Sequence, residues 1–230
     1  YVLGLYYIMD VLTSEFSEIL FESCSSGGGR FDPGMLYYMP QTWCSDNTDA
    51  IERLRIQYGT SFGYPMSSVS AHVSVCPNHQ NHRVTPFKTR GICAMQGTFG
   101  YELDLSKMTD EEKKMAGEQI AFFKEHGRLF QFGDYYRLTS PFENRDYTVW
   151  EYAAQDGSEA CMSVVYTDMY ANAASEIVKW KGLDPKKVYQ MQLDGEDAGN
   201  FSGAALMHAG ILLPLPEQNY DAFQIYLKAE

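Results

Sequence analysis

Apolar side chains near the start of the chain recur every three or four positions, which predicts an amphipathic helix. The repeating positions are Val2, Leu5, Tyr6, Met9 and Leu12. A short apolar run, Ile19–Phe21, follows between two glutamates. It is too short for a helix and predicts a buried parallel strand, because strands covered on both faces carry continuous apolar residues.

The next segments continue an alternation of strands and helices. Residues 23–29 are rich in serine and glycine and predict a loop. The apolar spacing from Asp49 to Tyr58 predicts a helix, with Ser45 or Asn47 as its cap. Residues 60–75 predict another strand with a long loop after it. This order of elements is typical of a βα barrel or a doubly wound sheet.

A further helix is predicted after Thr109, because Thr109 and Glu112 have the spacing of a capping box and Gly127 is placed to stop the helix. Beyond about residue 134 the pattern changes to short β-type segments separated by turn residues. These segments are Tyr147–Ala153, Ala160–Tyr166, Val188–Gln192 and Ala222–Leu227. We therefore expect an α/β part over residues 1–133 and an antiparallel β-domain over residues 134–230.

Composition narrows the function classes. The formal net charge of −12 at pH 7 repels phosphate backbones, so nucleic acid is not an expected partner. No apolar run is long enough to span a bilayer. The five cysteines are odd in number and lack a framework spacing, which favours reduced thiols in a cytoplasmic protein. Tyr1 lies inside an apparent helix, so we interpret the chain as a fragment.

The run Ser25–Gly29 follows a predicted parallel strand, at the edge that carries active sites in barrels and open α/β sheets. Its glycines would let a ligand approach the backbone closely. A phosphate-binding loop is disfavoured, because no Lys-Ser or Lys-Thr follows and no G-x-G-x-x-G pattern occurs. A flexible loop without a ligand explains the pattern equally well.

The segment Trp43–Asp49 brings an indole and two carboxylates together ahead of a helix. Asp46 and Asp49 suit the positive end of that helix, and the pattern alone favours this structural interpretation. The functional alternative is that one of them is a general acid. A carboxylic acid with a raised pKa can protonate a glycosidic oxygen.

Cys76, His79 and His82 are spaced three residues apart, as metal ligands could be. A closed zinc site needs four ligands, however, and no fourth lies nearby. We therefore favour a polar loop and predict no metal site. His72 is interpreted either as a polar group at the same edge of the barrel or as a buried core histidine.

Several of these segments together resemble the α-galactosidases of glycoside hydrolase family 36, the melibiases. The resemblance is carried by Phe21–Tyr38, Pro40–Ala50, Ala71–Ser74, Pro77–Gln80 and Phe99–Asp104, and it covers nearly the whole chain. It implies a large bacterial enzyme. This chain would then hold the carboxy-terminal portion of a (β/α)8 barrel, with its last two strands and last helices, followed by an antiparallel β-sandwich domain.

The resemblance also implies the site residues and partners. Asp46 matches the family's proton donor, and Cys24, Ser26, Gly27 and Trp43 match positions that contact galactose. The expected partners are α-galactoside oligosaccharides such as melibiose and raffinose. No cofactor, metal, nucleic acid or membrane is implied, and homo-oligomers, tetramers among them, occur in relatives of this type.

The family's nucleophile lies in a Lys-Trp-Asp motif, which this sequence lacks, because Lys179-Trp180 is followed by Lys181. The implied mechanism is a retaining double displacement in which this chain supplies the acid/base half of the site. The chain alone is therefore expected to be inactive. Three alternatives stay open: a galactosyl transferase of the same family, a non-catalytic sugar-binding module, and a nucleotide-binding protein. Cys44 departs from the Thr that relatives often carry.

Overall fold

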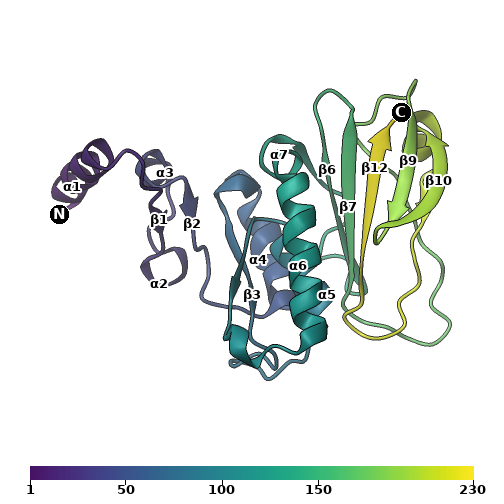
Figure 1. The fold of residues 1–230 in the computed structure, drawn as a ribbon, viewed down its shortest axis with the longest axis horizontal. Helices are drawn as coiled ribbons and strands as arrows, with labels where there is room; N and C mark the ends of the chain where they lie inside the picture. Colours follow the sequence, from purple (N-terminus) through teal and green to yellow (C-terminus); the bar gives the residue numbers. More distant parts are fainter.

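The computed structural model describes residues 1–230 and shows an extended amino-terminal arm, a central α/β part and a carboxy-terminal sheet (Figure 1). The arm holds helix α1 (Val2–Glu15), the single turn α2 (Ser25–Gly28) and helix α3 (Pro33–Tyr38). The predicted first helix is present, but none of its residues is buried. Its apolar side chains, Leu3 and Tyr7 among them, are exposed.

Four short parallel strands run through the arm and the α/β part. β1 (Glu22–Ser23) pairs with β2 (Gln41–Thr42), and β3 (Ser70–Ser74) pairs with β4 (Thr98–Glu102). A single parallel bridge, from the end of β2 to the residue before β3, joins the two pairs. The chain thus contributes four strands in parallel order, where the sequence predicted two.

Two strand predictions need correction. The run Ile19–Phe21 is not a buried strand, because Ile19 and Leu20 are 53% and 86% exposed and pairing begins only at Glu22. The covered position of that strand is the polar Ser23. Residues 60–75 are not one strand either: they contain a helix end, a 3-10 turn and then β3.

Four helices belong to the α/β part: α4 (Ala50–Thr60), α5 (Phe87–Ala94), α6 (Asp110–Glu125) and α7 (Gly127–Phe132). α5 contacts both β3 and the carboxy-terminal sheet, and Figure 1 shows these helices between the two. The glycine predicted to stop the long helix instead begins α7, one residue after a helical break.

Local hydrogen bonds explain where these helices begin. The capping box predicted for α6 is confirmed. The Thr109 side chain accepts the backbone N–H of Glu112, and the Glu112 side chain accepts the backbone N–H of Thr109. The cap predicted for α4 is wrong. Asp49 caps this helix by accepting from the backbone N–H of Glu52 at 2.9 Å. Ser45 and Asn47 instead accept backbone N–H groups inside the preceding loop.

A six-stranded antiparallel sheet forms the carboxy-terminal part, in the order β10-β9-β12-β7-β6-β5. Its strands are β5 (Asp134–Arg137), β6 (Tyr147–Ala153), β7 (Glu159–Tyr166), β9 (Val188–Leu193), β10 (Glu196–Ser202) and β12 (Ala222–Ala229). A two-stranded ladder of β8 (Ile177–Val178) and β11 (Ile211–Leu212) and the short helix α8 (Gly203–His208) complete it. The four predicted β segments all lie in this sheet, which confirms them.

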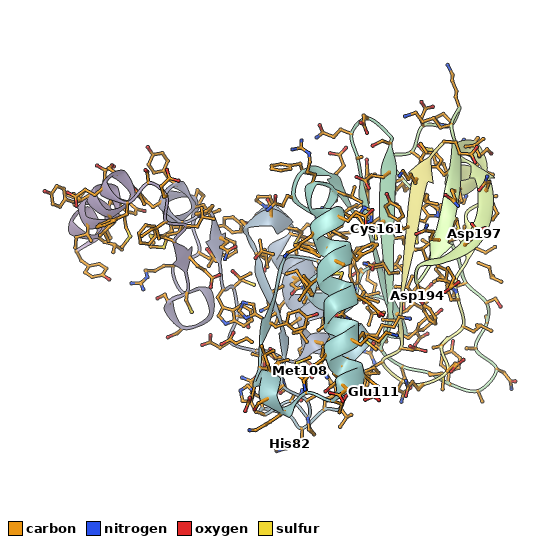
Figure 2. The ribbon with its side chains drawn as sticks, in the orientation of Figure 1. His82, Met108, Glu111, Cys161, Asp194 and Asp197 are labelled. Carbon is orange, nitrogen blue, oxygen red and sulfur yellow. The ribbon has the colours of Figure 1, made fainter.

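Both faces of this sheet are buried at its central strands, β6 and β7. Alternation along β6 sends Trp150 and Tyr152 into a core shared with α4, α5 and α7, and sends Val149 into a second core that contains Trp180. Cys161 of β7, labelled in Figure 2, lies in the first core, and burial raises the pKa of its thiol. The two cores fix the sheet against the α/β part.

Glu151 is a carboxyl group in the middle of β6 with no exposed surface. Its Oε2 accepts the backbone N–H of Lys181 at 2.9 Å, while Oε1 has no partner. Burial raises its pKa from 4.5 to about 8. Because the folded-state pKa lies above the unfolded one, the folded protein holds this proton more tightly. The contribution of this group to stability is therefore fully present below about pH 4.5 and is lost as pH rises through 8.

We therefore expect Glu151→Gln to remove this loss of stability. One unit of pKa shift corresponds to about 1.4 kcal/mol. As pH rises from 5 to 9, the free energy of unfolding of the variant should therefore gain roughly 2–4 kcal/mol relative to the parent. Thermal melts across that range measure the difference. The exposed Glu143→Gln is the matched control and should follow the parent. Parallel curves for parent and Glu151→Gln would contradict a buried titrating carboxyl.

Candidate functional site

The glycine-rich turn and the Trp43–Asp49 loop meet at one edge of the parallel strands. Both follow paired strands, β1 and β2, so their backbones run side by side. A Cβ atom at Gly27 would lie 2.6 Å from the backbone N of Asp46, and one at Gly28 would lie 2.9 Å from the carbonyl oxygen of Cys44. Real Cβ contacts are not this short, so only glycine allows the approach.

The turn itself has an uncommon backbone. Ser25 and Ser26 have φ values of 59° and 55°, and Gly27 and Gly28 follow at 70° and 89°. Left-handed serines cost conformational energy, and strain of this kind is concentrated at ligand-binding sites. Cys24 and Ser26 are exposed on this turn. The structure therefore brings all the sequence-predicted contact positions except Trp43 to an accessible backbone beside Asp46.

The Asp46 carboxylate is exposed and oriented. Its Oδ1 accepts a hydrogen bond from Trp43 Nε1 at 3.1 Å. The backbone carbonyl of Asp46 accepts from Gln80 Nε2 at 3.0 Å, and Gln80 Oε1 accepts from the backbone N–H of Thr48 at 3.1 Å. The loop around Gln80 thus fixes the backbone on either side of a carboxylate that faces solvent.

Trp43 is buried, with 9% of its surface exposed, and two planar groups cover its indole. The imidazole of His72 stacks on it at 4.4 Å with an 8° interplanar angle. The guanidinium carbon of Arg53 lies 4.4 Å from the ring centre. A galactose contact at Trp43 stays a prediction. The N–H edge of Trp43 meets Asp46.

Arg53 is the centre of the buried polar contacts beneath the site. It donates to the carbonyl of Ser45 at 3.1 Å, the carbonyl of Ser70 at 2.7 Å and Oε1 of Gln57 at 3.0 Å. Burial lowers the pKa of its guanidinium. Arg53 and Gln80 are residues that the sequence did not single out as functional, whereas His72 was considered as a polar group at this edge of the barrel. A charged residue on the buried stripe of α4 was the available signal for Arg53.

The other two aspartates of this stretch have structural partners. Asp49 is 1% exposed, caps α4 and pairs with Arg83. Asp32 caps α3 by accepting the backbone N–H of Met35 at 3.0 Å. Their carboxylates are therefore committed to helix starts, which leaves Asp46 as the accessible acid of the stretch.

The loop with Cys76, His79 and His82 has no ligand geometry. No group of three or more His, Cys, Asp or Glu side chains in the chain could hold a metal ion. The Cys76 thiol donates to the carbonyl of Thr85, and both histidines are exposed. Asn78 organises the loop by accepting two backbone N–H groups, that of Gln80 included.

Among the helices, none has the length and apolarity needed to cross a bilayer.

Comparison with known proteins decides the family. The Melibiase family model matches residues 1–133. The chain belongs to the melibiase family. The model described as Glycosyl hydrolase family 36 C-terminal domain matches residues 147–227. The predicted fold class, the carboxy-terminal portion of a (β/α)8 barrel followed by an antiparallel β-sandwich domain, is thereby confirmed.

Individual melibiase relatives are longer than this chain. It is 52% identical over 229 residues to the α-galactosidase AgaA of Geobacillus stearothermophilus, covering 100% of this chain and 31% of AgaA. It is 51% identical to the bifunctional α-galactosidase/sucrose kinase AgaSK of Mediterraneibacter gnavus, covering 97% of this chain and 24% of that protein. A crystal structure of an AgaA variant in complex with raffinose superposes with a TM-score of 0.95 at 51% identity, covering 100% of this chain and 31% of that one. The chain therefore spans about a third or less of these relatives.

Proposed function

We propose that this chain supplies the acid/base half of a retaining α-galactosidase site, with Asp46 as proton donor and acceptor. The observation that carries the proposal is the state of three aspartates: two are committed to helix caps, and Asp46 is exposed beside the glycine turn. The relatives named as α-galactosidases, one of them crystallised with raffinose, support α-galactoside oligosaccharides as substrates.

The hydrogen bond at Asp46 supports different tasks for its two oxygens. Oδ1 accepts the Trp43 N–H, so Oδ2 is the atom that carries and delivers the proton. In the first step a second carboxylate, from outside this chain, attacks the anomeric carbon while Oδ2 protonates the departing glycosidic oxygen. In the second step Asp46 removes a proton from a water molecule while the water oxygen attacks the anomeric carbon, which breaks the ester bond to the second carboxylate and releases galactose. Retaining enzymes hold the two carboxyl groups roughly 5–5.5 Å apart.

The other predicted contact residues suit galactose recognition. Cys24 and Ser26 present exposed side chains on a turn whose backbone is open to a ligand, and Gly27 joins that turn to Asp46. The division into residues 1–133 of the barrel and 134–230 of the β-domain belongs to this proposal, as does a homo-oligomeric enzyme.

An activity assay tests the proposal. We expect the complete enzyme to hydrolyse raffinose and to release galactose first as the α-anomer, which proton NMR detects before mutarotation. Sucrose added as acceptor separates hydrolysis from galactosyl transfer by its products. The 230-residue chain alone should show no turnover, since it lacks the second carboxylate. First-formed β-galactose, or robust turnover by the chain alone, would overturn the proposal.

A further inference from the structure

A glutamate–histidine pair lies directly behind the Asp46 loop and is not explained by the proton transfer itself. His72 is on β3 and Glu102 is at the end of β4, the neighbouring parallel strand. His72 Nδ1 lies 2.6 Å from Glu102 Oε2, an ion-pairing distance at which the two atoms are not aligned as a hydrogen bond. The two side chains are 22% and 70% exposed, so the pair adds little to stability.

The pair connects to the proposed acid through one aromatic ring. The His72 imidazole is nearly parallel to the Trp43 indole, and the Trp43 N–H donates to Asp46 Oδ1. The direction of that N–H depends on the rotation of the indole plane. The stacked imidazole, itself in contact with Glu102, packs against this plane, and the Arg53 guanidinium contacts the same ring.

The charges around the ring also favour this arrangement. A guanidinium near an indole polarises its N–H, which strengthens the bond to a carboxylate. Arg53 puts a positive charge against the ring, and Glu102 puts a negative charge against His72. Asp46 lies at the indole N–H.

We propose that His72 and Glu102 are positioning residues for Asp46, acting through the Trp43 indole. This inference rests on the proposed function and deepens it. Glu102, His72 and Trp43 form a relay of contacts that holds one oxygen of Asp46 at the indole N–H. The other oxygen then points at the glycosidic oxygen. It is needed most when protonation of the leaving group limits the rate.

The test compares two substrates of the complete enzyme. Raffinose has a poor leaving group and needs the proton, whereas a nitrophenyl α-galactoside has a good one and needs little. We expect His72→Ala to lower the raffinose-to-nitrophenyl ratio of kcat/KM by about tenfold. Glu102→Gln should lower it by a few fold. His72→Phe, which keeps a ring on the indole, should retain more of the ratio than His72→Ala.

Matched controls separate positioning from general damage. His208→Ala and Glu111→Gln change exposed residues of the same types far from the site and should leave the ratio unchanged; Figure 2 labels Glu111 at the start of α6. Trp43→Phe removes the N–H that reaches Asp46 and should lower the ratio. Its control is Trp180→Phe, which removes an indole N–H that has no partner. Thermal melts identify any variant that is simply misfolded.

A double substitution keeps this inference distinct from the proposed function. In an Asp46→Asn background, His72→Ala should change the ratio no further, because the group that it positions is gone. If Asp46→Asn lowers the ratio but His72→Ala lowers both substrates equally, the relay is overturned and the function stands. If Asp46→Asn itself leaves the ratio unchanged, both are overturned.

Discussion

Asp46→Asn in the complete enzyme should lower kcat/KM on raffinose by about 10²–10⁴-fold, the usual contribution of a positioned general acid. Asparagine keeps an oxygen that can accept the Trp43 N–H, so the loop geometry should persist. Only the proton is lost. Turnover of a nitrophenyl α-galactoside should fall far less in the glycosylation step, and the dissociation constant for galactose should stay within about twofold.

Asp49→Asn is the control for this experiment. Asp49 is buried, caps α4 and pairs with Arg83, so Asp49→Asn should lower the melting temperature by removing the charge that pairs with Arg83, while the amide oxygen can still cap the helix. Its effect on the two substrates should be the same, because the side chain does not reach solvent. If Asp49→Asn, and not Asp46→Asn, slowed raffinose much more than the nitrophenyl substrate, Asp49 would be the proton donor. Steady-state kinetics on both substrates, with pre-steady-state bursts to isolate the first step, measure the outcome.

Gly27→Ala should strongly reduce the activity of the complete enzyme. The new methyl would lie 2.6 Å from the backbone N of Asp46, against backbone atoms that cannot rotate away, and the residue has a φ of 70°. Relief requires the turn and the acid loop to separate. A 1 Å misplacement of catalytic groups can cost about 10²-fold in rate, and we expect a loss at least this large on every substrate.

Gly59→Ala is the matched control. Gly59 lies in α4, and a Cβ there meets nothing within 4 Å. Alanine is the better helix former by about 1 kcal/mol, so this variant should melt at a higher temperature with unchanged kinetics. If Gly27→Ala retained full activity, the close approach of the turn to the Asp46 loop would not be needed for function.

Local sequence signals predicted the elements that depend on local bonds. Thr109 and Glu112 form the capping box that their spacing indicated, and the β segment around Trp150 is a strand whose two faces pack into two different cores. The run at Ile19 was mistaken for a buried strand because an apolar run does not specify what packs against it. Strands as short as β1 and β2 have no periodicity of their own; pairing between them, not composition, defines them.

The choice between the aspartates could not be made from spacing. Asp46 and Asp49 are both near a helix start, and the partner that commits Asp49 to structure, Arg83, is 34 residues away. Trp43 likewise matched a sugar-contact position in the sequence. Its ring proved to be covered by Arg53 and His72, from another helix and another strand, and only the tertiary structure brings these together.

Gln80 donates a hydrogen bond to the backbone carbonyl of Asp46, so the loop that carries Gln80 is a target for enzyme engineering. Asn78 and Gln80 hold this loop from the inside, while His79 and His82 extend into solvent from the same few residues. Figure 2 shows His82 at the lower tip of the α/β part. Libraries that vary the two histidines and keep the two amides would diversify the rim of the site without disturbing the acid.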